Sequence, residues 1–271
     1  MQKFGLNQPL YVQYYLYLKG IFATFPPDLG VSTQYYPQSV ASLIVSRAGW
    51  TLLLIVASLF LAFAISYGLG ALSSIKRGSK AEMISTYLTI FIHATPVYWS
   101  ALILLFIFAA TLHWFPIFGK VSVNATGGFA YFTSVLWHAV LPVIAMTLSI
   151  FGENYLVLRG TVQDVMKSDY VTAASLRGLR ARMVATKYVL RNSLLPLVSI
   201  LAFSLAGLVS RAILVEAVFG YAGLGDLVVD AALNFDYPVL EGSLFVLTLM
   251  IIAGGLIGDL VLLRLDPKLR R

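Results

Sequence analysis

The chain contains no cysteine, and this absence removes several kinds of chemistry at once. Disulfides, thiolate metal sites and cysteine nucleophiles are all excluded. Histidine is scarce as well, because His93, His113 and His138 are the only three, and they show no metal-ligand spacing. The sequence therefore predicts no metal site in this chain.

Catalytic motifs are missing too. The sequence contains no Gly-x-x-x-x-Gly-Lys-Ser/Thr, so it cannot cradle the phosphates of ATP by that route. It also lacks Gly-x-Ser-x-Gly, His-Glu-x-x-His and a close pair of carboxylates within an apolar stretch. We expect no catalytic residue, no bound cofactor and no enzyme activity. Any process in this protein that needs ATP hydrolysis must obtain it from another polypeptide.

Charged residues are few. Only 11% of the 271 residues are charged and 59% are apolar, which leaves too little polar surface to cover a water-soluble globule. No Pro, Gly or Ser-rich linker divides the chain. The net charge of +7 lies in loops between apolar stretches, where positive charge normally sets membrane orientation. We expect one membrane domain whose partner is the lipid bilayer, with no nucleic acid.

The apolar residues form five stretches, each long enough for the roughly 20 residues that a helix needs to cross the hydrocarbon layer. The stretches are 49–72, 83–110, 135–158, 193–215 and 242–263. None alternates strictly with a period of two, which favours helices over a barrel. The fold class predicted is all-α, a polytopic helical membrane protein.

The basic residues set an orientation. Fourteen of the nineteen fall on one side, in the segments 73–82, 159–192 and 264–271. Positively charged loops stay in the cytoplasm, so we expect a cytoplasmic C-terminus and an N-terminus outside. Residues 1–48 would then be an extracytoplasmic leader, with an amphipathic helix from Pro9, and residues 49–271 the membrane domain.

The loop over 159–192 is much longer than the roughly 2 to 8 residues that most helix connections need. Apolar residues recur at helical spacing from Val162 through Tyr170, Ala173 and Leu176, which predicts one surface helix. Gly178 then predicts a turn with positive φ, followed by a second basic helix over about 180–192. Such ordered length indicates docking to a partner, although charges that only fix topology and touch lipid headgroups are the alternative.

Particular residues of this loop resemble a known family. They are Tyr170, Ala173, Ala174, Gly178 and Leu179, followed by LRNSLLP at 190–196. Further matching segments are GLNQPLYVQY near the start, PDLGVS at 27–32, GLG at 223–225, DYPVLEG at 236–242 and LDPKLR near the end. Together they resemble the EAA-loop permeases of binding-protein-dependent ABC importers, in the dipeptide and oligopeptide (peptide, nickel and opine) branch.

The resemblance implies a permease subunit in the plasma or inner membrane that forms part of a path for short peptides. Oligosaccharide, nickel or opine import by the same machinery stays open. Its partners would be a second homologous permease, two ATP-binding cassette subunits that hold ATP and Mg, and an extracytoplasmic binding protein. The coupling-helix residues that dock on the ATPase would be Asp169, Tyr170, Ala173, Ala174, Gly178 and Leu179.

Family members normally have six spans, and GLNQPLYVQY normally follows the first. We therefore expect that a first span is missing from this sequence, through a late start codon or a shortened gene.

Within the second stretch, Pro96 removes a backbone donor and should kink the helix. His93, Pro96, Tyr98 and Trp99 are candidates for lining a pathway. Near the span ends, four charged residues are expected at the membrane interface: Glu153, Arg211, Glu216 and Asp259. An external turn is predicted at Gly220, Gly223 and Gly225. Close helix packing is predicted at Gly254 and Gly258.

A reading from a different class is an ATP-independent secondary transporter or channel. Such a protein should carry carboxylates for a coupling ion at mid-membrane and often an internal repeat. The five stretches do not divide into equal halves, and no repeat is evident. The permease reading is therefore preferred.

Overall fold

The computed structural model describes residues 8–23, 27–75, 78–125 and 127–265, and in these ranges the regular structure is helical apart from one antiparallel bridge between Val31 and Ser39. In chain order the helices are α1 (Leu10–Phe22), α2 (Val40–Ile75), α3 (Lys80–Ala94), α4 (Val97–Leu104), the π-helix η2 (Leu105–Thr111), α5 (Gly128–Met166), α6 (Asp169–Leu176), α7 (Ala181–Met183), the π-helix η3 (Val184–Leu190), α8 (Arg191–Phe219), α9 (Leu224–Leu233) and α10 (Tyr237–Leu265). The predicted all-α class is confirmed.

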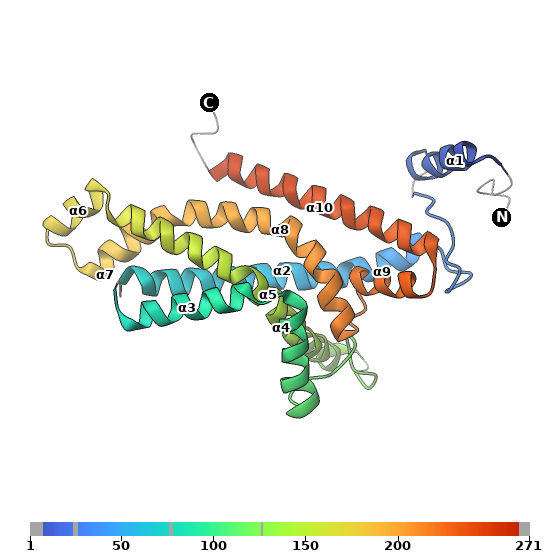
Figure 1. The fold of residues 1–271 in the computed structure, drawn as a ribbon, viewed down its shortest axis with the longest axis horizontal. Coiled ribbons are helices and arrows are strands. Elements are labelled where there is room, and N and C mark those ends of the chain that lie inside the picture. Colours follow the sequence, from blue (N-terminus) through green and yellow to red (C-terminus); the bar gives the residue numbers. More distant parts are fainter. Residues whose placement is uncertain (1–7, 24–26, 76–77, 126, 266–271) are drawn as a thin grey trace.

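Long apolar helices dominate this arrangement, and several of them run along the long axis of the molecule (Figure 1). In the described part of the chain, three are long and apolar enough to cross a membrane, within α2, α5 and α10. The number rises to five if two bent pairs are each one span, namely α3 with α4 and η2, and the two halves of the helix over 181–219. Each of the five predicted stretches lies within one of these helices or pairs.

The second predicted stretch is broken rather than kinked. Its two parts meet at an angle of 101°. Thr95 is extended, with φ −82° and ψ 125°, because the residue before a proline is pushed out of the helical region. Pro96 then stands at the N-cap of α4, where its missing N–H costs nothing. The sequence located this bend correctly but underestimated its size.

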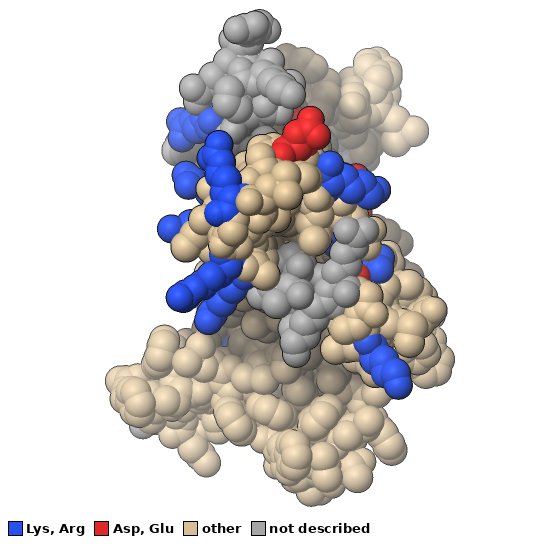
Figure 2. Space-filling view, turned by 90° about the vertical axis from the view of Figure 1, so that its left-hand side faces the viewer, with Lys and Arg blue, Asp and Glu red and all other residues tan. Residues whose placement is uncertain are grey.

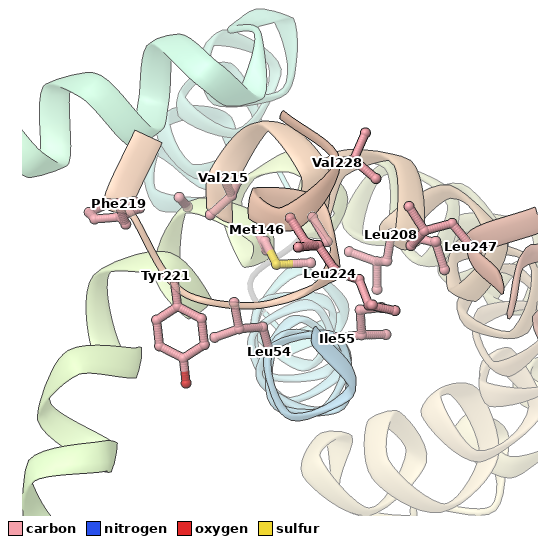
Figure 3. Close-up of a cluster of buried hydrophobic side chains, with 14 of the residues drawn as sticks. Leu54, Ile55, Met146, Leu208, Val215, Phe219, Tyr221, Leu224, Val228 and Leu247 are labelled. Carbon is pink, nitrogen blue, oxygen red and sulfur yellow. The ribbon is translucent and has the colours of Figure 1, made fainter. Parts of the chain in front are cut away.

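The main core lies where α2, α5, α8, α9 and α10 meet. Figure 3 shows side chains from these helices converging, among them Leu54 of α2, Met146 of α5, Leu208 of α8 and Leu224 of α9. Gly254 of α10 is buried against α8, and a Cβ built on it would lie 3.4 Å from the backbone nitrogen of Ala206, which is an ordinary contact distance. That Gly254 and Gly258 allow close helix packing stays a prediction.

A second, smaller core lies at the end of the molecule that carries α6 and α7 (Figure 1). Its buried residues come from α5, α6, η3 and α8: Leu158, Val162, Val171, Ala174, Val184, Val189, Leu190 and Leu197. Phe63 and Tyr67 of α2 pack against it. The charged loop is therefore folded onto the helices that it connects, with apolar contacts of its own.

Candidate functional site: the charged loop and its supports

Basic side chains gather at the end of the molecule formed by α6, α7 and the start of α3. Seen from that end, Lys and Arg side chains are spread over the surface, and few Asp and Glu side chains lie among them (Figure 2). The exposed basic residues of the loop include Arg177, Arg180, Arg182, Lys187 and Arg191. The described basic residues of the 159–192 loop thus lie at one end of the molecule.

The prediction of a single surface helix from Val162 to Leu176 was wrong, because the helix is interrupted at residues 167 and 168. Val162 belongs to the last turns of α5, and α6 starts anew at Asp169. Ser168 is extended, with φ −72° and ψ 148°, and its hydroxyl donates to the carbonyl oxygen of Val165 at 2.5 Å. The same carbonyl also accepts from the backbone N–H of Ser168 at 3.1 Å, so the serine closes the end of α5 through both groups.

The break turns a different face of α6 inward. Val171 and Ala174 are buried in the second core, at 5% and 3% exposure. Tyr170 and Leu176, expected on one apolar stripe, are 45% and 84% exposed instead. Asp169 and Ala173 are exposed as well. Of the predicted docking residues on α6, Ala174 packs against its own chain, whereas Asp169, Tyr170 and Ala173 are exposed.

Gly178 ends this helix with φ +75°, as the sequence predicted. A Cβ built on it would meet nothing within 4 Å, so only the backbone conformation demands glycine here. Leu179, the next residue, is partly buried against the second core. The loop therefore reverses direction over 177–180 without any tight packing at the turn.

The second basic helix does not end near Asn192 as predicted. α7 passes through η3 directly into α8, and Pro196 lies inside α8. The helical path from Ala181 to Phe219 is bent by 49° instead. π-helical segments are rare and frequently occur at functional sites. Here one joins the loop to a membrane helix.

The start of α3 is held to the end of α5 by polar contacts near the loop. Arg159 Nε lies 3.1 Å from Glu82 Oε1, and the Glu82 side chain is only 6% exposed. The other carboxylate oxygen accepts a hydrogen bond from the backbone N–H of Gly78 at 2.6 Å. Ser79 caps the same helix by accepting from the Glu82 N–H. Ser79 followed three residues later by Glu82 is a capping-box signal in the sequence, but no sequence pattern indicates the pairing of Glu82 with Arg159.

The candidate pathway residues lie around the break between α3 and α4. His93 and Pro96 are exposed. Tyr98 and Trp99 are 42% and 51% exposed, with ring centroids 6.4 Å apart. These four residues lie on neighbouring turns either side of the break, and their part in a pathway stays a prediction.

At the opposite end, Glu216 does not reach the interface as expected. It is fully buried, and its Oε2 accepts hydrogen bonds from the backbone N–H groups of Gly225, at 2.7 Å, and Asp226, at 3.3 Å. Carboxylates are favoured at a helix N-terminus, where these N–H groups have no partner within the helix. Glu216 therefore fixes the start of α9, and Gly223 and Gly225, two of the three glycines predicted as a turn, allow its close approach.

Three further contacts tie the segment before α2, and α2 itself, to α9 and to the residue before α10. Tyr35 donates a hydrogen bond to Asp230 at 2.6 Å, and this bond, together with burial, raises the pKa of the tyrosine. Arg47 pairs with Asp226 at 3.0 Å. Ser32 donates to the buried Asp236. Residues far apart in the sequence thus form one polar network at this end.

Comparisons with known proteins agree with the loop motifs. Residues 66–271 match the family described as binding-protein-dependent transport system inner membrane component. The oligopeptide transport system permease protein AppB of Bacillus subtilis (strain 168) is 32% identical over 269 residues, covering 99% of this chain and 83% of that protein. The dipeptide transport system permease protein DppB of Escherichia coli (strain K12) is 28% identical, covering 100% and 84%. The resemblance read from the sequence is confirmed.

Solved structures agree in fold. A chain of the methionine ABC transporter MetNI, in an inward-facing conformation, superposes with a TM-score of 0.67 at 15% identity, covering 83% of this chain and 97% of that chain. A chain of an amino acid ABC transporter superposes with a TM-score of 0.61, also at 15% identity, covering 83% and 95%. With the family match and the identity to AppB, the chain belongs to the inner membrane components of binding-protein-dependent transport systems.

Proposed function

We propose that this permease subunit forms part of a translocation path for short peptides. The proposal rests on relatives such as AppB and DppB, which are named for oligopeptide and dipeptide transport and match nearly the whole chain. Oligosaccharide, nickel and opine remain competing cargoes for the same machinery. The bent pair of α3 and α4, with exposed Tyr98 and Trp99, offers aromatic surface for a varied cargo.

The observation that carries the coupling mechanism is the two-sided character of α6. Val171 and Ala174 bury one face in the chain's own second core, while Asp169, Tyr170 and Ala173 leave the other face free. Because one face of α6 packs against its own chain and the other is exposed, a partner that displaces the exposed face also displaces the helices packed on the buried face. ATP and Mg are bound by a separate subunit, and α6 sits in a cleft of that subunit.

The assembly comprises this chain, a second homologous permease, two ATP-binding cassette subunits and an extracytoplasmic binding protein. The basic end with α6 and α7 lies in the cytoplasm, and the network around α9 lies outside. Closure of the ATPase sites moves α6, and the spans shift between inward-open and outward-open packing. Because the translocation path is open to the outside in one packing and to the cytoplasm in the other, cargo delivered on the outside is released into the cytoplasm.

Cross-linking tests the docking face, and the cysteine-free chain gives a clean background. Ala173→Cys should cross-link to a cysteine in the cleft of the ATPase subunit. Ala174→Cys, one residue away and 3% exposed, is the matched control and should react poorly. Equal reaction at both positions, or none at Ala173 in folded complexes, would contradict docking through this face.

Reconstituted uptake tests the cargo and the energy source. The complete assembly should take up labelled short peptides into vesicles only when ATP is supplied, and labelled oligosaccharides, nickel and opines serve as the competing cargoes. Movement driven by an ion gradient without the ATPase subunits would favour the secondary-transporter alternative and overturn the proposal.

A further inference from the structure

α3 depends on α5 for its place in the fold. It packs chiefly along α5, and its contacts with α2 are slight. α4, which follows the break, packs on both α5 and α8. The two halves of this bent pair therefore attach differently, since α3 belongs to α5 whereas α4 bridges α5 and α8.

The contact between α3 and α5 follows one stripe on each helix. From the basic end inward, Arg159 pairs with Glu82. One turn further, the Tyr155 hydroxyl lies 3.2 Å from the Ser85 hydroxyl and 3.1 Å from the Thr86 hydroxyl. Ser85 and Thr86 both donate to the carbonyl oxygen of Glu82, so either can accept from Tyr155, whose single hydroxyl proton lies between the two acceptors.

Beyond these polar contacts the two backbones come close together. A Cβ built on Gly152 would lie 2.6 Å from the Cβ of His93 and 3.3 Å from the carbonyl oxygen of Thr89. Residues 152, 155 and 159 are spaced by three and four along α5, and so share one face. We call this set of contacts, at residues 82, 85, 86, 89 and 93 of α3 and 152, 155 and 159 of α5, the α3–α5 seam.

The seam lies directly before the charged loop. Arg159 precedes the end of α5 by two turns, and α6 follows that end after a two-residue break. A displacement of α6 therefore reaches the seam through α5. Because Glu82 is almost fully buried, sliding α3 along α5 would separate its carboxylate from Arg159 and leave a buried charge held only by the N–H of Gly78, directly before α3. The two helices are thus expected to move together.

We propose that Glu82, Arg159 and Tyr155 are positioning residues that make α3 and α5 one rigid lever, which delivers the motion of α6 to the break at Thr95 and Pro96. This inference rests on the proposed coupling function and specifies the path by which motion is transmitted within the chain. Since α4 also packs on α8, any shift of α5 against α8 is taken up as a change of angle at the break. The aromatic residues after the break then move relative to α3.

Removing charge from the seam tests the lever. In the reconstituted assembly, Glu82→Gln should retain ATP hydrolysis while uptake per ATP falls on the order of tenfold, as expected from losing one charge-assisted hydrogen bond. Asp164→Asn is the matched control, because its pair with Lys167 is exposed on both sides, at 81% and 68%. Tyr155→Phe keeps the ring and removes only the hydroxyl, so it should uncouple partly without loss of folding.

A cross-link separates a moving lever from a merely structural contact. Glu82→Cys with Arg159→Cys should give an uncoupled assembly, and joining the two thiols with a bifunctional reagent should restore uptake per ATP. Loss of residual uptake on cross-linking would overturn the inference, because it would mean that α3 must leave α5 during the cycle. Unchanged coupling in Glu82→Gln would overturn it as well. Absence of ATP-dependent uptake by the wild-type assembly would contradict the proposed function, and the inference with it.

Discussion

Glu216 Oε2 accepts a 2.7 Å hydrogen bond from the backbone N–H of Gly225, which ties the start of α9 to the end of α8. The approach requires a glycine, since a Cβ on Gly225 would lie 2.4 Å from the Cα of Ile213. The N–H of Leu224 is satisfied separately by the hydroxyl of Thr51 on α2, at 2.8 Å. The first turn of α9 is therefore held by side chains from two membrane helices.

Glu216→Ala should detach this turn. The change leaves the buried N–H of Gly225 without an acceptor, which costs about 1–3 kcal/mol, and also removes the acceptor of the partly buried N–H of Asp226. We expect a lower thermal unfolding temperature in detergent and faster proteolysis within 220–236. Glu241→Ala, an exposed glutamate of α10, is the control and should change neither. Equal effects of the two substitutions would show that the buried cap adds no stability.

The same substitution at two glycines of α5 should act with opposite sign. Gly160→Ala meets no atom within 4 Å and gains helix propensity, so it should stabilise the protein by up to about 1 kcal/mol. Gly152→Ala gains the same propensity but drives a Cβ to 2.6 Å from the Cβ of His93, so it should destabilise. Thermal unfolding of both variants checks the prediction, and two shifts of the same sign would contradict the close approach of α3 and α5.

The membrane helices could be predicted because length and apolar composition alone define a span. The turn at Gly178 could also be predicted from the sequence, since a glycine between two helical patterns favours a positive φ. The break at residues 167 and 168 was not. The apolar spacing runs through it without interruption, and only the tertiary burial of Val171 and Ala174 decides which face of α6 turns inward.

Long-range polar contacts were the least predictable part of the site. Glu216 lies close to a span end, where sequence reasoning expects contact with the interface, and its actual partners lie on a separate helix nine and ten residues further along. Glu82 carried a local capping signal, but its pairing with Arg159 across 77 residues had none. Such pairs depend on which helices become neighbours, and a single sequence does not contain that information in its periodicity.

Acid should weaken the end of the molecule around Asp236. Burial alone would raise the pKa of this carboxyl, but hydrogen bonds from the Ser32 hydroxyl and from backbone N–H groups, including that of Gln34, lower it overall. A lowered folded pKa stabilises the fold above the unfolded value of about 3.9, and this stability is lost as the pH falls through the folded pKa.

Ser32→Ala removes one of the donors that lower the pKa of Asp236, so the variant should show a smaller loss of stability on acidification than the wild type. Thermal unfolding across the acid range measures the difference. Parallel curves for the two proteins would mean that the Ser32 hydroxyl does not lower the pKa of Asp236.

Gly178→Val should separate stability in the membrane from coupling. At φ +75° a left-handed conformation costs an ordinary residue roughly 1–2 kcal/mol, and a β-branched side chain more, although no neighbouring atom lies within 4 Å. The strain is confined to the turn after α6, so the variant should still insert while uptake per ATP decreases. Gly178→Asn is the matched variant, because asparagine tolerates the left-handed region, and it should stay close to wild type. Reconstituted uptake measured with ATP hydrolysis distinguishes them, and full coupling in the valine variant would mean that the position of α6 does not depend on this turn.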